Sequence, residues 1–358
     1  MLSTPLLKVI GLLINANKPS GIKRIRRMME KDAEVLPVMC DIDHKTAALM
    51  HAKLNRENTL AGGGAVCDYW FVGDKTRYAQ KTCAEKEKRM SNEKIKPKLN
   101  GTAETMLQCF YARAMHSKNP KNKFHDAKAE ELIDRLDYDF SKAQNDSAMS
   151  GGIVARSVVF DEIVSDFISK YPDCTVVNIA CGLDTRAYRM DNGKLTWYNL
   201  DLPETIEVRD SIYKESGRIS TIACSVLDPA WADQVKVRGK MLFIIEGLTM
   251  YMTAEDVKTM LGIIRDHFDN AYVCMETLCP LFVKKEGIEK SIKATGATFT
   301  WGANKFDDLG DIAAGFKKVK DDNIARGMST LTPLYGLIEW MPIVKRFAEK
   351  ILIFEKEN

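Results

Sequence analysis

The chain has 358 residues, of which 45% are hydrophobic and 28% are charged, so it is long enough to bury the core of one large or two modest domains. Nine cysteines occur without a CxxC pair, and neither a signal-peptide pattern nor an apolar run of about 18 residues is found, which argues against an extracellular disulfide scaffold and against a membrane span. We therefore expect a cytoplasmic protein that has no membrane partner.

Residues 1–100 are expected to form a basic, partly helical leader and linker. They hold 19 Lys and Arg against 11 Asp and Glu, whereas the rest of the chain holds 33 against 38. Residues 5–35 suggest two short amphipathic helices, and residues 85–98 form a Lys- and Glu-rich stretch typical of a linker or an exposed helix. Without an aromatic-rich basic face or a zinc-ligand spacing, this charge does not predict nucleic-acid binding.

From residue 101 onward the pattern becomes regular, with strands and helices that alternate after the first three helices. The predicted helices are 103–116, 126–136, 153–170, 203–214, 254–267 and 335–348. The predicted strands are 175–180, 195–200, 219–224, 241–246, 271–276 and 350–355. Continuous apolar strands that alternate with amphipathic helices predict an α/β fold, in which a mainly parallel sheet is covered on both faces.

The first predicted strand ends in a turn of small residues, Ala180-Cys181-Gly182. In such sheets a ligand binds at the carboxyl ends of the strands. Aligning the dinucleotide fingerprint G-x-G-x-x-G on Gly182 places Ala180 and Thr185 at the other two glycine positions, so a pyrophosphate would be poorly held. S-adenosylmethionine has no phosphate and requires only one close approach to the backbone. The turn therefore favours S-adenosylmethionine over a nicotinamide dinucleotide.

Acidic residues end two further strands. Asp201 lies 19 residues after Gly182, where a carboxylate can accept both ribose hydroxyls, although it can also cap the helix that begins at Pro203. Glu246 follows five apolar residues, and a buried acid at that position needs a cationic partner. The ammonium of a methionine moiety would supply that partner, whereas a nicotinamide would not.

These residues belong to a set of longer segments: YARAMHSKNP (111–120), DAKAEELIDRLDYDF (126–140), VARS (154–157), NIACGLDTRAYR (178–189), WYNLDLPETIEVR (197–209), SVLDPAW (225–231) and EGLTMYMTAEDV (246–257). Through them the chain from about residue 101 to 358 resembles the leucine carboxyl methyltransferase family, especially its bacterial polyketide-type O-methyltransferase branch. The resemblance implies a class I methyltransferase domain over 101–358. This is a Rossmann-like seven-stranded sheet with an antiparallel last hairpin and a helical lid at 101–150.

The resemblance also implies which residues bind the cofactor, S-adenosylmethionine. They are Arg156, Ala180, Gly182, Asp201, Val226, Leu227 and Glu246. Arg156 would bind the cofactor carboxylate, a task suited to a guanidinium fork, and Glu246 would face the amino-acid end. Val226 and Leu227 would lie beside the adenine. Ala180 stands where the family usually has glycine, so a requirement for positive φ there would lower cofactor affinity.

The triplet Asp184-Thr185-Arg186 follows the turn. Asp184 is expected to cap a short helix, and Arg186 to pair with an acid behind the site. We interpret the triplet as a scaffold for the site rather than as part of the catalytic machinery.

Methyl transfer from a sulfonium is an in-line displacement, in which proximity and alignment provide most of the acceleration. The sequence shows no Ser-His-Asp or paired-carboxylate arrangement, which favours an acceptor that needs no base, namely a carboxylate or an acidic phenol. Tyr251, five residues after Glu246, is either a catalytic residue that orients the acceptor oxygen or a core aromatic. We predict an O-methyltransferase that acts on a carboxylate or hydroxyl of a small molecule, without a metal. The alternatives are a methyltransferase of protein C-terminal carboxylates and an inactive regulatory protein that binds S-adenosylmethionine.

Overall fold

The computed structural model describes residues 52–55, 70–73, 94–97, 101–144, 146–213, 215–283, 298–337, 341 and 347–357. The chain divides into two compact units, residues 1–93 and residues 94–358. In the first unit, strand β1 (Ala52–Asn55) pairs antiparallel with β2 (Trp70–Gly73). The helices expected within residues 5–35 lie outside the described residues.

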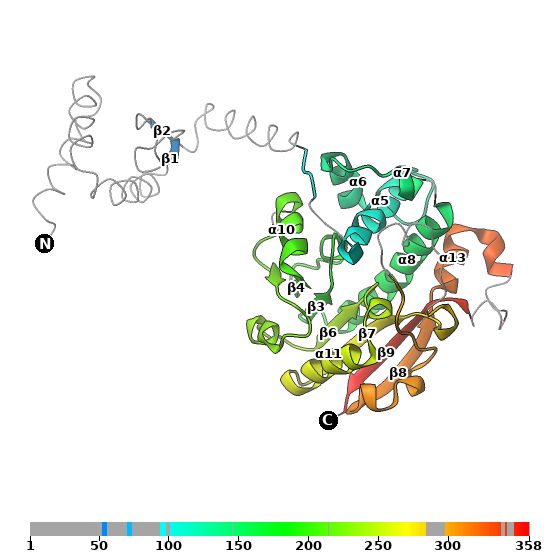
Figure 1. Ribbon diagram of the computed structural model, residues 1–358. Helices are drawn as coiled ribbons and strands as arrows, with labels where there is room; N and C mark the ends of the chain where they lie inside the picture. Colours follow the sequence, from blue (N-terminus) through cyan, green and yellow to red (C-terminus); the bar gives the residue numbers. More distant parts are fainter. Residues whose placement is uncertain are drawn as a thin grey trace, which may run out of the picture. The chain divides into compact units, whose positions relative to one another are not determined.

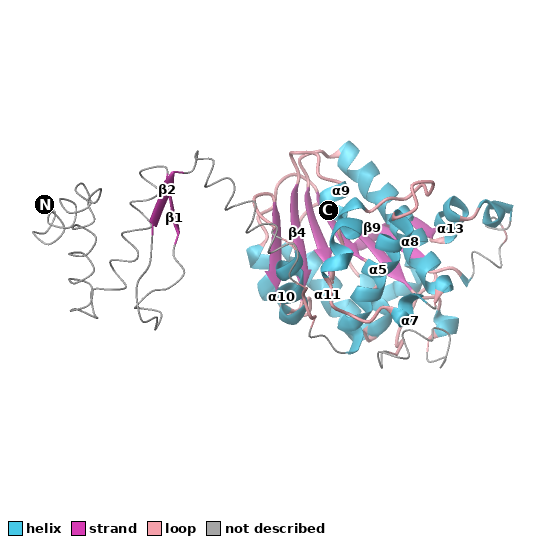
Figure 2. Cartoon of the chain, turned by 90° about the horizontal axis from the view of Figure 1, so that it is seen from above, coloured by secondary structure: helices cyan, strands magenta, loops and turns pink. Residues whose placement is uncertain are grey.

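The second unit is built on a seven-stranded sheet with helices on both sides (Figures 1 and 2). Its strands are β3 (Thr175–Ile179), β4 (Thr196–Asp201), β5 (Ile219–Ala223), β6 (Met241–Ile245), β7 (Ala271–Thr277), β8 (Phe316–Asn323) and β9 (Lys350–Lys356). The spatial order is β5-β4-β3-β6-β7-β9-β8, in which the first five strands are parallel and β9 is antiparallel to both β7 and β8. The expected sheet with its antiparallel last hairpin is confirmed.

The helices cover both faces of this sheet. They are α5 (Thr105–Ser117), α6 (Ala127–Leu132), α7 (Ser141–Gln144), α8 (Ser147–Lys170), α9 (Arg186–Arg189), α10 (Pro203–Ile212), α11 (Ala254–His267) and α13 (Ala325–Leu331). Val176 of β3 packs in one buried cluster with Phe160 of α8, whereas its neighbour Val177 packs in a second cluster with Leu261 of α11. Because successive side chains of a strand point to opposite faces, the continuous apolar sequence of β3 is required by burial on both sides.

All six predicted strands were placed within one residue at either end. Strand β8, with the sequence FKKVKDDN, was missed because it lies at the edge of the sheet, where only one of its eight residues is buried and the sequence has no apolar pattern. Lysines at such an edge discourage pairing with another chain. Helix α8 begins six residues earlier than expected, where the Asp146 side chain accepts a hydrogen bond from the Met149 backbone N–H at 3.0 Å.

Two further segments differ from the sequence-based expectation. Helix α13 was not predicted, and the backbone of its Gly327 lies so close to α8 that an added Cβ would lie 2.1 Å from the Ala155 carbonyl oxygen. The helix predicted at 335–348 falls largely outside the described residues. None of the described helices is both long enough and apolar enough to cross a membrane.

Helices α5, α6 and α7, which occupy the segment expected to form a lid, gather next to α8 (Figure 1). Residues 94–97 pack with them. The Ile95 backbone N–H donates to the Arg135 carbonyl at 2.8 Å, and the Ile95 carbonyl accepts from the Asp137 N–H at 2.8 Å. The second unit therefore begins at Lys94, somewhat before the boundary at residue 101 that the sequence suggested.

We expect a fragment of residues 94–358 to fold and to bind S-adenosylhomocysteine. A fragment that begins at Gly101 lacks the two Ile95 hydrogen bonds, which together contribute about 1–3 kcal/mol to the free energy of unfolding. Its melting temperature should therefore be about 2–10 °C lower. Thermal melts and cofactor titrations of both fragments beside the full chain measure this. If the 94–358 fragment is insoluble or binds nothing, residues 1–93 complete the fold.

Candidate active site

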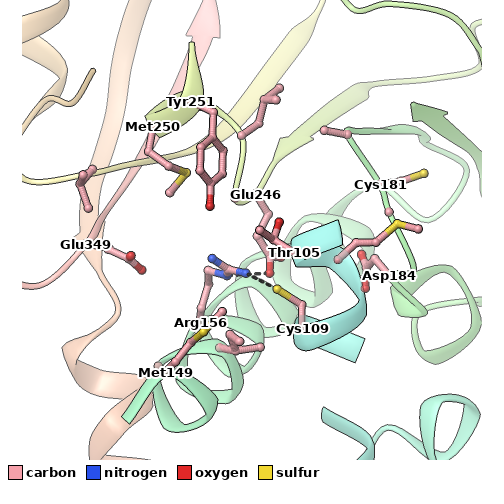
Figure 3. Close-up of a pocket in the computed structure, with 18 of the residues that line it drawn as sticks. Thr105, Cys109, Met149, Arg156, Cys181, Asp184, Glu246, Met250, Tyr251 and Glu349 are labelled. Atoms are coloured by element: carbon pink, nitrogen blue, oxygen red, sulfur yellow. Dashed lines mark hydrogen bonds and ion pairs between the residues drawn. The ribbon is translucent and has the colours of Figure 1, made fainter. Parts of the chain in front are cut away.

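A cavity of about 510 Å³ opens at the carboxyl ends of β3, β4, β6 and β7, and its other walls come from α5 and α8 (Figure 3). Its position includes the point between β3 and β6 where the strand order reverses, and its volume is typical of a small-ligand site. Six of the predicted site residues line it: Arg156, Ala180, Gly182, Asp201, Glu246 and Tyr251.

Val226 and Leu227 are not among the described residues that line the cavity, although the sequence placed both beside the adenine. Val226 packs against the main hydrophobic core, and its carbonyl accepts a hydrogen bond from the Trp231 indole N–H at 3.1 Å. The Leu227 side chain is 36% exposed. The segment after β5 is therefore folded around the fully buried Trp231, which holds Val226 away from the cavity wall.

The turn after β3 brings backbone close to the cavity through two residues with positive φ. Gly182 has a φ of 47°, and a Cβ added there would lie 3.0 Å from the Cβ of Met106 on α5. Glycine is thus required both by the backbone conformation and by the approach of α5. Ala180 has a φ of 52°, so the position where the family usually has glycine does take a left-handed conformation in this chain.

Replacing Ala180 by glycine is expected to stabilise the protein slightly and to leave cofactor binding equal or tighter. The left-handed conformation costs alanine about 1–2 kcal/mol, and glycine removes this cost. Glycine loses about 0.5–1 kcal/mol of that gain, because its unfolded chain has more conformational entropy. Chemical denaturation and calorimetric titration of Ala180→Gly measure both effects. Ala314 is a matched control because its φ is −55°, so Ala314→Gly should lose stability. A less stable Ala180→Gly variant would contradict the proposed strain.

Asp201 is the last residue of β4, and its carboxylate lies on the cavity wall beside the turn. One oxygen accepts a hydrogen bond from the Gly182 N–H at 2.8 Å, and the other accepts from the Leu202 N–H at 2.7 Å, at the start of α10. Burial raises the pKa of this carboxyl, while the two backbone N–H groups oppose that rise. The side chain therefore links β4 to the glycine turn and keeps its remaining acceptor capacity for a ligand.

Glu246 follows β6, and its sequence context had suggested the ammonium of a ligand as its cationic partner. In the structure two arginines of the chain provide the opposite charge. One oxygen accepts from Arg156 Nε at 2.9 Å (Figure 3). The other accepts from Arg186 Nη2 at 2.8 Å. The Glu246 side chain is only 14% exposed, so its two arginines satisfy a buried charge. Arg156 reaches one acid more, because its Nη1 lies 3.3 Å from an oxygen of Glu276.

The Asp184-Thr185-Arg186 triplet forms part of an ionic network at the cavity, which Asp184 itself lines. The residue at the N-cap of α9 is Thr185 rather than the predicted Asp184, but the Asp184 carboxylate still accepts from the Arg186 N–H at 3.0 Å. It also pairs with the Arg186 guanidinium at 2.7 Å, so the expected acid partner of Arg186 is present. Thr185 Oγ1 donates to Asp126, which caps α6 and also pairs with Arg113 of α5 at 2.9 Å. The network thereby ties the helices over the cavity to the turn after β3.

Asp126 and Arg113 were not singled out from the sequence, although both lie within segments that carry the family resemblance. Burial by itself would raise the pKa of the fully buried Asp126 carboxyl, but Arg113 and Arg189 outweigh it and lower that pKa. Arg113 also donates to the Leu183 carbonyl at 2.8 Å. A buried, charge-assisted contact of this kind holds α5 against the turn.

Part of the cavity lining is apolar and aromatic. The rings of Tyr251 and Phe299 lie 5.6 Å apart, and those of Phe282 and Phe347 lie 5.9 Å apart. Met149, Met250 and Leu278 also line the cavity. The three phenylalanines were not singled out from the sequence, because they lie on separate segments that only the fold brings together.

The residues that line the cavity fit S-adenosylmethionine. Gly182 gives one close approach to backbone, Asp201 offers a carboxylate for a ribose diol, and Arg156 offers a guanidinium for a carboxylate. The third glycine position of a dinucleotide fingerprint is occupied by Thr185, which is fully buried and hydrogen-bonded to Asp126. Such a turn does not suit a pyrophosphate.

Sequence comparison with known proteins finds methyltransferases, in agreement with a cavity that fits S-adenosylmethionine. A sequence model of the leucine carboxyl methyltransferase family matches residues 106–265, and a model described as L-2-amino-thiazoline-4-carboxylic acid hydrolase matches residues 24–71. Tetracenomycin polyketide synthesis O-methyltransferase TcmP of Streptomyces glaucescens is 35% identical over 206 residues, which cover 57% of this chain and 76% of that protein. The S-adenosyl-L-methionine-dependent methyltransferase dpfgK of Gibberella zeae is 28% identical over 232 residues, which cover 58% of this chain and 78% of that protein.

Among solved structures, a DUF574 family protein from Streptomyces avermitilis matches with a TM-score of 0.47 and 12% identity, over 71% of this chain and 97% of that one. The family assignment depends instead on the sequence relatives, above all on the 35% identity that spans most of TcmP. The matched residues 106–265 include the glycine turn, Asp201 and Glu246. The chain therefore belongs to the leucine carboxyl methyltransferase family and is an S-adenosylmethionine-dependent methyltransferase.

Proposed function

We propose that this enzyme transfers a methyl group to an oxygen atom of a small, largely apolar molecule. The observation that carries this proposal is one continuous cavity whose lining extends from Gly182 and Asp201 to the aromatic group of Tyr251, Phe299 and Phe347. An acceptor with an apolar body would bury its surface against that group. TcmP, the Streptomyces relative, is named as an O-methyltransferase of polyketide synthesis, which supports a small acceptor of this kind.

The residues of the cavity would have separate tasks. Asp201 would accept the ribose hydroxyls, and Arg156, held by Glu246, would bind the carboxylate of the cofactor's amino-acid end. When bound, the cofactor supplies a methyl group activated on a sulfonium. Tyr251 would orient the acceptor oxygen toward that group, and the aromatic side chains would exclude water. Alignment of this kind is the main source of acceleration in a displacement reaction.

The proposal extends to the cellular location, which we place in the cytoplasm. The six cysteines among the described residues are all free thiols, and five of them lie in or against buried parts of the fold. Unpaired thiols suit a reducing compartment.

Incubation with S-adenosylmethionine labelled on the methyl group tests the proposal. A cell extract is first separated into a small-molecule fraction and a protein fraction, and each is supplied as acceptor. We expect label in the small molecules, and we expect Tyr251→Phe to reduce it while binding S-adenosylhomocysteine as the wild type does. Label found only in the proteins would contradict a small-molecule acceptor and favour a protein carboxyl methyltransferase.

A further inference from the structure

Glu276, the penultimate residue of β7, lies against the Arg156 guanidinium, a contact that the sequence did not reveal. The Glu276 side chain is 0% exposed, and its Oε2 atom accepts a hydrogen bond from Arg156 Nη1 at 3.3 Å. The same oxygen accepts from the Gly247 N–H at 2.6 Å, in the turn that follows β6. One oxygen of Glu276 is therefore joined both to the side chain of α8 that lines the cavity and to the turn after β6.

The turn after β6 packs against the guanidinium and is fastened to β7. Gly247 has a φ of 69°, which favours glycine, and a Cβ added there would lie 3.6 Å from both Nη1 and Nη2 of Arg156. Two residues further on, the fully buried Thr249 donates its hydroxyl hydrogen to the Glu276 carbonyl at 2.6 Å. Glu276 thus holds this turn at two points while its side chain contacts Arg156.

Two of the three nitrogens of the Arg156 guanidinium are held by acids. Nε donates to Glu246 at 2.9 Å, and Nη1 donates to Glu276 at 3.3 Å. In the described part of the chain, the one hydrogen-bond contact of Nη2 is with Cys109 Sγ at 3.7 Å, and sulfur is a weak acceptor (Figure 3). Because a guanidinium is planar and rigid, holding two of its nitrogens also fixes the third. The donor capacity of Nη2 is therefore kept in one position on the cavity wall.

We propose that Glu276 is a positioning residue for the cofactor, which holds the Arg156 guanidinium so that Nη2 meets the carboxylate of S-adenosylmethionine. This rests on the proposed role of Arg156 as the partner of that carboxylate. Glu246 alone would leave the guanidinium free to swing about one hydrogen bond at Nε. A group that is ordered before the ligand arrives loses less entropy on binding, so Glu276 contributes to the affinity for the amino-acid end of the cofactor.

The task of Glu276 requires an acceptor oxygen rather than a negative charge. Burial raises the pKa of Glu276 well above its usual range, although the positive charge of Arg156 opposes this rise. The oxygen of a glutamine amide can take the place of Oε2 and accept from both Gly247 and Arg156. Glutamine at this position should therefore preserve the contact, whereas leucine removes it.

Binding titrations of the full chain with two compounds test this inference. S-adenosylhomocysteine has the carboxylate, whereas 5′-methylthioadenosine lacks the whole amino-acid end. We expect Glu276→Leu to weaken S-adenosylhomocysteine binding by about 10–100-fold, the usual range for loss of a hydrogen bond to a charged group, and to leave methylthioadenosine binding unchanged. Glu276→Gln should bind S-adenosylhomocysteine within about 3-fold of the wild type.

Thr277→Val is the matched control for the loss of a buried hydrogen bond in β7. The Thr277 side chain points to the other face of the sheet and donates to the Ala303 carbonyl at 2.8 Å. We expect this variant to lose stability and to bind both compounds as the wild type does. The inference is overturned if Glu276→Leu loses affinity equally for both compounds, which is the mark of a purely structural role. It is also overturned if Glu276→Gln binds S-adenosylhomocysteine as weakly as Glu276→Leu.

Arg156→Met separates this inference from the proposed function. We expect it to weaken S-adenosylhomocysteine binding at least as much as Glu276→Leu does. The double variant should bind no more weakly than Arg156→Met, because Glu276 acts through that arginine, and a further loss contradicts the inference. If Arg156→Met binds as the wild type does, the proposed role of Arg156 fails and the inference falls with it. If only Glu276→Leu binds as the wild type does, the inference falls and the role of Arg156 stands.

Discussion

Replacing Glu246 by alanine is expected to abolish measurable cofactor binding and to lower the free energy of unfolding by about 3–5 kcal/mol, the usual effect of removing one partner of a buried ion pair. The variant leaves Arg156 with Glu276 as its only remaining ion-pair partner in the described structure, and it removes one of the three acids around Arg186. The guanidinium that should bind the cofactor carboxylate would then no longer be held in place. Calorimetric titration and a thermal melt measure the two effects.

Asp161→Ala is the matched control for that experiment. Asp161 pairs with Arg186 at 2.6 Å and with Arg189 at 2.9 Å, but it is not among the described residues that line the cavity. We expect this variant to lose stability and to bind S-adenosylmethionine nearly as the wild type does. Equal losses of affinity in both variants would show that Glu246 acts only through the network. A Glu246→Ala variant with the wild-type melting shift on adding cofactor would refute its role at the site.

Replacing Asp201 by asparagine should weaken S-adenosylmethionine binding by about 1.5–3 kcal/mol, or about 10–150-fold, because a charged acceptor for the ribose hydroxyls is lost. Asparagine is preferable to alanine because Asp201 also accepts from the Gly182 and Leu202 N–H groups, and the amide oxygen retains one of these bonds. The melting temperature without ligand should change little.

The exposed Asp210 lies on α10, the helix that follows Asp201, and provides a control that removes the same charge away from the cavity. Asp210→Asn should leave the affinity unchanged. Calorimetry with S-adenosylmethionine and S-adenosylhomocysteine compares the two variants. If Asp201→Asn binds both compounds as the wild type does, then Asp201 serves only to link β4 to the turn.

The strain at Ala180 was found by combining the sequence with the backbone conformation in the structure. The sequence identified a departure from the glycine expected at that position, and the structure supplied the φ of 52° that makes the departure costly. The same holds for Glu246. Its apolar surroundings predicted a buried acid in need of a cation, but only the structure showed that Arg156 and Arg186 provide it.

The sequence by itself determined the α/β architecture and the glycine turn and Asp201 that line the cavity. Strands buried on both faces are continuously apolar, a glycine turn follows the first of them, and Asp201 ends the next, so each signal is contained within a few consecutive residues. These features are local, and they were placed to within one or two residues.

Tertiary structure alone decided which aromatic side chains line the cavity. Strand β8 escaped prediction because an exposed, charged edge has no apolar pattern, and its partner β9 returns antiparallel to lie beside β7. That return brings Lys350 opposite Thr277 and Phe347 to Phe282. Contacts of this kind depend on strand register between distant segments. No periodicity within either segment encodes them, so they form only once the sheet is assembled.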